Sequence, residues 1–291
     1  MTLDDINHYD TLPRTIGSDY DNHIVFKYLE IIKTFYNTIS LGNNSIEIPA
    51  LFSKTKVFST IGYIYSSIEG TIESISVLLH NGRCNDAFAL VRKYCDSIIL
   101  DIYKYIIVEE IDEKFQGNLS IESIKNNKIK SWIDSEEALF TEKQMNKIYA
   151  TIKEKYPDLT NLFDLSNKNT LYHKLREICN DNMHYNYFYN MMANDYEIIK
   201  LRKDIRDSFI KNIKDAVVLF FTIHFAFIYK NKPIVYMSLD YINYLDCGMT
   251  PPRGSERWVS LAVQNAFDDI IKTNKPEVAT FLKDLDLMDL K

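Results

Sequence analysis

The scarcity of glycine and proline constrains the fold of this chain more than any other feature of its sequence. Only 8 glycines and 7 prolines are spread over 291 residues, whereas a sandwich or barrel of short strands needs turn residues about every ten positions. Hydrophobic residues make up 46% of the chain, which is ample material for a large core. We therefore predict an all-α fold, a bundle of long antiparallel helices.

Apolar periodicity locates the helices of this bundle. The first should run from about residue 21 to 40 and stop at the LGNN sequence of residues 41–44. A second should follow Pro49 and end at Asn81-Gly82, where glycine can take a left-handed conformation. Asn81-Gly82 could also form a hairpin turn, but its flanks do not alternate as strands would. Further helices are expected at residues 85–109, at 135–155, from 171, and at 201–230.

One large helical domain, residues 1–291, accounts for these elements. Residues 20–110 and 170–285 would form the two lobes of its core, and the more charged residues 111–169 would form a peripheral insertion. The segment KPIVYMSLDYINYL, residues 232–245, fits either a strand or a short helix. After the break at Pro251, Pro252 and Gly254, Ser255 is placed to cap a last helix.

Several features bear on the compartment. The apolar sequence AVVLFFTIHFAFIY, residues 216–229, is shorter than a bilayer span and contains Thr222 and His224. We therefore expect a buried core helix and no contact with a membrane. The amino terminus lacks the pattern of a secretory signal, and the four cysteines lack CxxC spacing. These features favour the reducing cytoplasm.

The helix expected at residues 85–109 has two distinct sides. A narrow polar strip should face solvent, and an apolar stripe should face the core; the strip contains Lys93, Ser97, Asp101 and Lys104, and the stripe Phe88, Cys95, Ile99, Ile102 and Ile106. Arg92 lies in line with the apolar stripe, and Asp96 follows four residues later. We expect them to form a buried ion pair, which could orient a neighbouring site.

The sequence LYHKLREICNDNMHYN, residues 171–186, carries the strongest functional signal. Arg176, Asn180 and His184 recur every four residues and His173 lies three residues before them, so one helix face should carry all four. This composition suits a phosphodiester: an imidazole can transfer protons near neutral pH, while a guanidinium stabilises the phosphate charge. Asn180 could hold the imidazole tautomer or bind phosphate. The surrounding residues are Asn182, Tyr185, Asn186 and Tyr187, and either tyrosine could stack on an unpaired base.

Other chemistries lack their sequence motifs. The chain contains no P-loop, Rossmann glycine fingerprint, GxSxG elbow, HExxH pair or EF-hand loop. His173 and His184 could reach a metal, but no carboxylate stands at ligand spacing. We therefore expect neither a metal nor another cofactor. The net charge of −6 argues against a broad contact with duplex nucleic acid, although it allows a small basic RNA site.

Arginine, then Asn or Asp, then histidine near the end of a helix pair resembles the HEPN superfamily of bacterial all-helical proteins. Many of its members are metal-independent ribonucleases of toxin and antiphage systems. The run from NGRCNDAFALVRKYCDSIILDIY to REICNDNMHYN is also similar to abortive-infection-type bacterial helical proteins, over most of residues 80–270. The resemblance implies that His184 is catalytic, that Asn180 or Asp181 is the polar residue, and that a homodimer assembles the site.

The arginine of this motif is displaced. In the family, four to six residues separate the arginine from the histidine, whereas seven separate Arg176 from His184, and Ile178 stands where the arginine would fit best. Under the resemblance, Arg176 is a displaced substitute. Arg92, from the neighbouring helix, could supply the missing cation.

Two functions remain open at this point. The first is a metal-independent endoribonuclease effector that acts on RNA, with His184 as general acid or base, Arg176 or Arg92 on phosphate, and Asn180 orienting. The second is a non-catalytic interaction or regulatory protein of a defence system, with a protein partner from the same operon. In that case the same stripe forms a buried hydrogen-bond network. An open, electropositive cleft would favour the first function, and burial the second.

Overall fold

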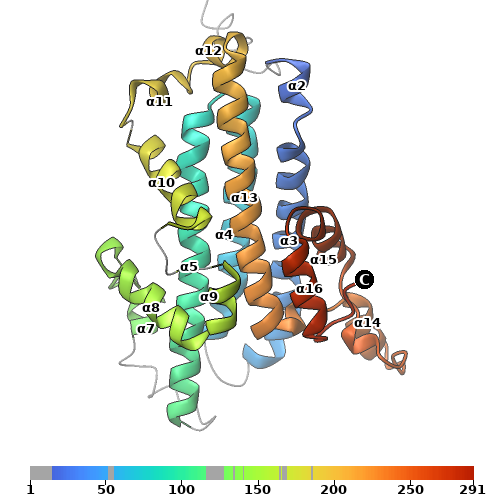
Figure 1. Cartoon of the computed structure of the whole chain (residues 1–291). Coiled ribbons are helices and arrows are strands. Elements are labelled where there is room, and N and C mark those ends of the chain that lie inside the picture. The colour runs from blue at the N-terminus through green and yellow to red at the C-terminus, as the bar shows by residue number, and fades with distance from the viewer. Residues whose placement is uncertain are drawn as a thin grey trace, which may run out of the picture.

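The structure confirms the all-α class (Figure 1). The computed structural model describes residues 15–51, 56–115, 128–133, 135–139, 141–163, 165, 169–184 and 186–291. Within these ranges the chain forms helices and turns, and the only β pairing there is an isolated bridge between Met237 and Val259.

Four long helices form the frame of the bundle. They are α3 (Ile24–Leu51), α4 (Lys56–His80), α5 (Cys84–Phe115) and α13 (Lys203–Asn231). Consecutive helices α3, α4 and α5 pack side by side, and α13 packs against both α3 and α5. The helix α3 continues through LGNN to Leu51, so the expected stop at residue 41 was wrong. Gly and Asn each cost only about 1 kcal/mol or less in a helix interior, so they weaken a helix without ending it.

The predicted turn at Asn81-Gly82 makes α4 and α5 antiparallel. Gly82 has a φ of 69°, and the N–H groups of Gly82 and Arg83 donate to the carbonyls of Leu79 and Leu78 at 2.9 Å each. These two bonds form the glycine-terminated helix end known as the Schellman motif. A Cβ at Gly82 would lie 3.2 Å from Ile16, so both the conformation and the available space favour glycine.

The long helix α13 runs in the same direction as α3 and α5 (Figure 1). At its start, Lys203 pairs at 2.9 Å with Asp19 of the short helix α2 (Ser18–Asp21), which precedes α3. Near its end, His224 reaches Asp101 in the middle of α5. The frame therefore combines antiparallel neighbours with one parallel helix, which the chain reaches only after residue 202.

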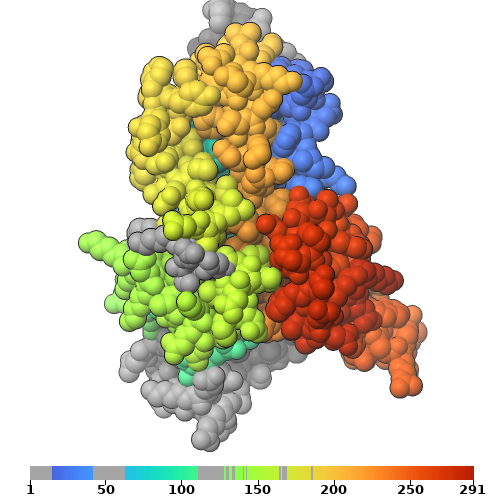
Figure 2. Space-filling model, in the orientation of Figure 1, coloured from blue at the N-terminus to red at the C-terminus, as the bar shows by residue number. Residues whose placement is uncertain are grey.

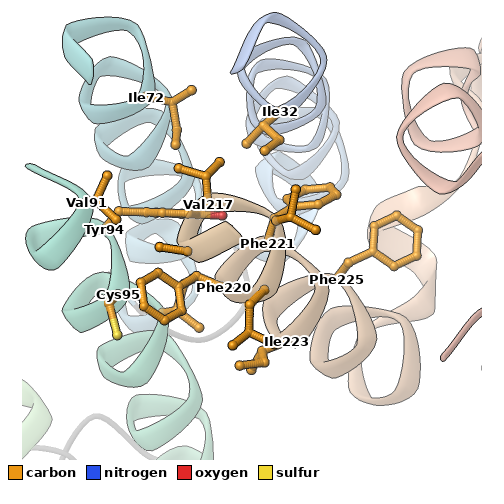
Figure 3. Close-up of a cluster of buried hydrophobic side chains, with 14 of the residues drawn as sticks. Ile32, Ile72, Val91, Tyr94, Cys95, Val217, Phe220, Phe221, Ile223 and Phe225 are labelled. Carbon is orange, nitrogen blue, oxygen red and sulfur yellow. The ribbon is translucent and has the colours of Figure 1, made fainter. Parts of the chain in front are cut away.

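Helix α13 is the core helix that the sequence predicts. All residues from 216 to 229 are buried, and aromatic side chains extend from α13 toward several neighbours (Figure 3). The ring of Phe221 lies 5.1 Å from that of Phe35 in α3, and Phe220 lies 5.7 Å from Tyr172. This helix is long and apolar enough to cross a membrane, but 83% of its most apolar 18-residue stretch is buried inside the protein.

The charged segment at residues 111–169 adds short helices beside the frame: α7 (Lys128–Ile133), α8 (Met145–Lys155) and α9 (Pro157–Phe163). The helix expected at residues 135–155 begins only at Met145, after a 3₁₀ turn at Glu142–Gln144. α8 contacts α5 and α9 contacts α13, and Ile148, Ile152 and Leu159 are buried in the main core. The described part of this segment therefore extends the core.

The carboxyl-terminal part of the chain forms further helices, the last two of which pack against α3 and α13. They are α14 (Leu239–Asp246), α15 (Leu261–Ala266) with its π-helical continuation Phe267–Lys272, and α16 (Pro276–Asp284). The ambiguous segment at residues 232–245 forms a 3₁₀ turn, Pro233–Tyr236, followed by α14. Ser260 rather than Ser255 caps α15, because the chain is extended at Trp258 and becomes helical only after Ser260.

A buried ionic network joins α5 to α13 and α3. Asp101 is fully buried; its carboxylate lies 2.9 Å from the Lys104 ammonium, 3.2 Å from His224 Nε2 and 3.5 Å from the Lys232 ammonium. On its other side, His224 Nδ1 lies 2.8 Å from the hydroxyl of Tyr36 in α3. The expectation that Asp101 and Lys104 face solvent was wrong, since α13 lies over this part of α5.

The pKa directions define the charge states in this network. Burial alone would raise the pKa of Asp101, but Lys104, Lys232 and His224 hold that pKa well below its usual range. Burial lowers the pKa of His224, and the nearby Asp101 only partly opposes this effect. His224 is therefore neutral at pH 7: Nε2–H donates to Asp101, and Nδ1 accepts from the Tyr36 hydroxyl.

We expect His224 to make the protein less stable in mild acid. Its pKa in the folded protein is below the ordinary 6.5, so below about pH 6.5 the unfolded chain binds a proton that the folded chain does not, and the free energy of unfolding falls. Urea unfolding between about pH 7.5 and pH 5 should show this loss, and His224→Gln should show a smaller one. His23, whose pKa burial and Lys214 also lower, contributes to both proteins. If the free energy of unfolding fell equally with pH in the wild type and in His224→Gln, the lowered pKa of His224 would not be the cause.

Candidate functional site: a pocket between α5 and α10

The stripe predicted at residues 171–186 lies on α10 (Leu171–Met183) and on the residue that ends it. Thr170 caps the amino end, where its hydroxyl accepts from the His173 N–H, and His184 is the C-cap. The N–H of His184 donates to the carbonyl of Asn180 at 3.3 Å. His184 thus follows the helical path for one more residue, and its exposed side chain is held at the end of the helix.

Asn180 and His184 line an open pocket of about 560 Å³ between α10 and α5. The opposite wall comes from α5, where Arg92 and Asp96 contribute as well as the residues beside them. The complete lining is Ala89, Arg92, Lys93, Asp96, Ser97, Leu100, Asn180, Met183 and His184. Four residues proposed from the sequence therefore meet in one pocket, although α5 and α10 are about eighty residues apart.

The predicted ion pair between Arg92 and Asp96 is present and extends to α10. Arg92 is 4% exposed, and its guanidinium contacts the carboxylate of Asp96. Arg176 approaches the same carboxylate from α10, with Nη2 3.8 Å from Oδ1. One carboxylate thus bridges two arginines, which holds the two helices together beside the pocket.

Positive charge predominates around this pocket. Its lining contains two cationic groups, Arg92 and Lys93, against the single carboxylate of Asp96, and Arg176 pairs with that carboxylate from outside the lining. Burial lowers the pKa of Arg92, but its hydrogen bond and charge interaction with Asp96 more than compensate, so the pKa lies above its ordinary value. An anion that can accept several hydrogen bonds, such as a phosphate group, suits this wall.

His173 does not join the pocket. Its Nε2 lies 2.8 Å from the carbonyl of Leu165, and its ring packs against those of Tyr149 and Tyr172 at 5.3 and 5.1 Å. His173 lies on the same stripe, three residues before Arg176, but its ring packs on Tyr149 of α8 and does not line the pocket. Among the described residues, no three His, Cys, Asp or Glu side chains are grouped so as to hold a metal ion.

The remaining candidates lie on the other side of the last turn of α10. Asn182 is buried, and its amide donates to the Ile178 carbonyl at 2.8 Å. The carboxylate of Asp181 accepts from the Asn186 amide at 2.9 Å. Both residues line a second, smaller hollow. Tyr185 lies outside the described residues.

Sequence reasoning placed Lys93 and Ser97 on a solvent strip and did not include them in the site. Both line the pocket, next to Arg92 and Asp96. Their sequence positions could have indicated this, because Lys93 follows Arg92 and Ser97 follows Asp96 directly in the chain. A partner helix that packs beside the predicted ion pair also lies close to these two residues. The identity of that partner helix, α10, could not be derived from periodicity.

Comparison of the chain with protein-family models, with curated proteins and with solved structures found no match.

Asp96→Asn should destabilise the protein by about 1–3 kcal/mol, because two arginines would lose the charge that compensates them. Ser97→Ala, at the adjacent residue of the same pocket wall, is the matched control and should stay within about 0.5 kcal/mol of the wild type. Urea unfolding measures both changes. Equal stability of Asp96→Asn and the wild type would show that the carboxylate does not hold α5 and α10 together.

Proposed function

We propose that the protein is a metal-independent endoribonuclease-like effector of a bacterial antiphage or toxin system, acting in the cytoplasm. One observation carries the proposal: the exposed imidazole of His184 shares an open pocket with Arg92, Lys93 and Asn180. A proton-transferring group next to cations is the minimum that cleavage of RNA without a metal requires.

The chemistry needs one proton acceptor and a stabilised phosphorus centre. His184 accepts the proton of a ribose 2′-hydroxyl, and the 2′-oxygen attacks the adjacent phosphorus. The bond from phosphorus to the 5′-oxygen breaks, and that oxygen takes a proton from a water molecule. The protonated His184 then gives its proton to the resulting hydroxide, which leaves a cyclic phosphate, a 5′-hydroxyl end and the original imidazole. The lysine and arginine side chains of the pocket wall stabilise the charge that develops on the phosphate.

Arg92 is better placed than Arg176 to supply the cation. Arg92 lines the pocket together with His184, whereas Arg176 does not line it and pairs with Asp96. This supports the role expected for Arg92 from the family resemblance, in which the neighbouring helix supplies the cation because Arg176 is displaced. Arg176 then holds Asp96, which in turn positions Arg92.

A homodimer fits the surface beside the pocket. Exposed apolar side chains follow one another along α10 and α11 (Phe188–Met192): Met183 is 41% exposed, Phe188 75% and Met191 53%. Apolar surface of this kind often marks a contact with another protein. A second copy seated here would lie close to His184 and could complete its site.

The alternative is a non-catalytic interaction or regulatory protein of a defence system, with a protein partner encoded in the same operon. The net charge of −6 favours it, and so does the largely buried cluster of Arg92, Asp96 and Arg176, which can serve helix packing alone. The exposed apolar segment of α10 and α11 would then receive that partner.

Cleavage of labelled total RNA and tRNA in EDTA distinguishes these functions. We expect the wild type to cleave RNA and His184→Ala to lose at least about 100-fold in rate, the contribution typical of general acid–base catalysis. Thermal melting of both should agree closely, because His184 is exposed. His80→Ala is the matched control, since His80 is an exposed histidine at the end of α4, and it should cleave as the wild type does.

Two results would overturn the ribonuclease. One is equal cleavage by the wild type and His184→Ala, which would trace the activity to another group or to a contaminant. The other is absence of cleavage by any of the proteins together with a lowered melting temperature of His184→Ala, which would favour the interaction protein.

A further inference from the structure

A second hollow, of about 210 Å³, lies on the opposite side of the last turn of α10 from the cationic pocket. In Figure 2 it separates α10 and α11, in yellow, from α13, in orange, and α5 is visible in teal at its floor. Binding sites for drug-sized ligands measure about 300–1,000 Å³. The volume of this hollow therefore suits a smaller group, such as one planar ring system.

The polar lining of this hollow differs in sign from that of the pocket. Among its described lining residues are the carboxylate of Asp181 and several amides but no Lys, Arg or His. A phosphate would be repelled here, whereas a neutral group that carries N–H donors would be accepted. The two sides of α10 therefore suit different chemical groups, a phosphate on one side and a neutral hydrogen-bond donor on the other.

Asn182 carries an unused hydrogen-bond acceptor next to this hollow. The residue is 4% exposed and lines the hollow; its Oδ1 is itself covered by protein atoms and has no hydrogen-bond partner among the described residues. Its Nδ2 donates to the Ile178 carbonyl at 2.8 Å, which distinguishes the amide nitrogen from the oxygen. A buried carbonyl oxygen without a donor is costly, so a small turn of the amide that brings Oδ1 to a ligand N–H is favoured.

Aromatic rings provide the apolar part of the lining. Tyr189 is stacked on Phe209 of α13, with ring centroids 5.9 Å apart and planes inclined by 22°. Tyr187 also lines the hollow and is 62% exposed. Exposed tyrosines beside polar amides are the combination that binds unstacked bases of single-stranded RNA.

We propose that this hollow binds an unpaired nucleobase that carries an exocyclic amino group, with its ring against Tyr187 and its amino group donating to Asn182 Oδ1 and Asp181. This inference rests on the proposed function, since it names the part of the RNA next to the phosphate in the cationic pocket. Acidic side chains accept from the amino group of cytosine in the same way in other recognition sites. A helix with its side chains is about 10–12 Å wide, so neighbouring nucleotides of one strand can occupy both hollows.

Fluorescence anisotropy with labelled RNA of about ten nucleotides tests this site, since single-strand binding sites span about 4–16 nucleotides. Oligo(C) and oligo(U) are the probes, because their rings are alike in size and differ mainly in the amino group. All measurements use a His184→Ala background, so that binding is read without cleavage. We expect oligo(C) to bind at least about fivefold more tightly than oligo(U), and Asn182→Ala to remove this preference.

Tyr187→Ala should weaken oligo(C) binding about tenfold, and Tyr187→Phe, which keeps the ring, should not. Tyr63→Ala is the matched control, because Tyr63 is a tyrosine of α4 that is 76% exposed and lines neither hollow; it should change affinity less than about twofold. If Asn182→Ala does not fold, the tyrosine variants alone decide, since Tyr187 is exposed.

The inference fails if oligo(C) and oligo(U) bind equally, if Tyr187→Ala binds as Tyr63→Ala does, or if Tyr187→Ala only dissociates a dimer. Its outcome is separate from that of the ribonuclease. If the protein cleaves RNA but binds oligo(C) and oligo(U) equally, the ribonuclease is supported and this base-binding site is refuted. If the protein prefers oligo(C) but never cleaves RNA, the base-binding site is supported and the ribonuclease is refuted.

Discussion

The contact between Asp101 and His224 is the constraint on which the orientation of α5 depends. It holds a fully buried carboxylate against α13, and Lys104 and Lys232 supply the charge that such burial requires. With 3.6 residues per turn, a residue nine positions earlier lies half a turn around the helix. Fixing Asp101 against α13 therefore directs Arg92 away from it, toward α10.

Because α5 turns Arg92 toward α10, the candidate site has two different sides around α10. On one side of α10, Arg92 and Lys93 meet His184 in an open pocket where cations outnumber carboxylates. On the other side, Asp181 and Asn182 line a smaller hollow with aromatic rings and no cation among its described residues. A single-stranded polyanion with neutral bases has matching parts: phosphate for the first hollow and base for the second. The acidic net charge then matters less than the local charge of each hollow.

The helices could be predicted from sequence because scarce Gly and Pro, together with apolar periodicity, are local properties. The ion pair of Arg92 and Asp96 was predictable for the same reason, since one helix carries both residues. Where the helices meet is a tertiary property, and the errors lie there. Asp101 and Lys104 look like solvent residues until α13 covers them, and His173 shares the α10 stripe until α8 supplies Tyr149 as its neighbour.

Histidine NMR tests whether His184 and the cations beside it form a nucleic-acid site. In protein with isotope-labelled histidines, a cleavage-resistant 2′-deoxy cytosine oligonucleotide would be titrated while the imidazole signals are followed. We expect the His184 signals to shift in a saturable manner, while those of exposed His80 and buried His224 stay in place. Unchanged His184 signals at saturating oligonucleotide, or equal shifts at His80, would contradict this expectation.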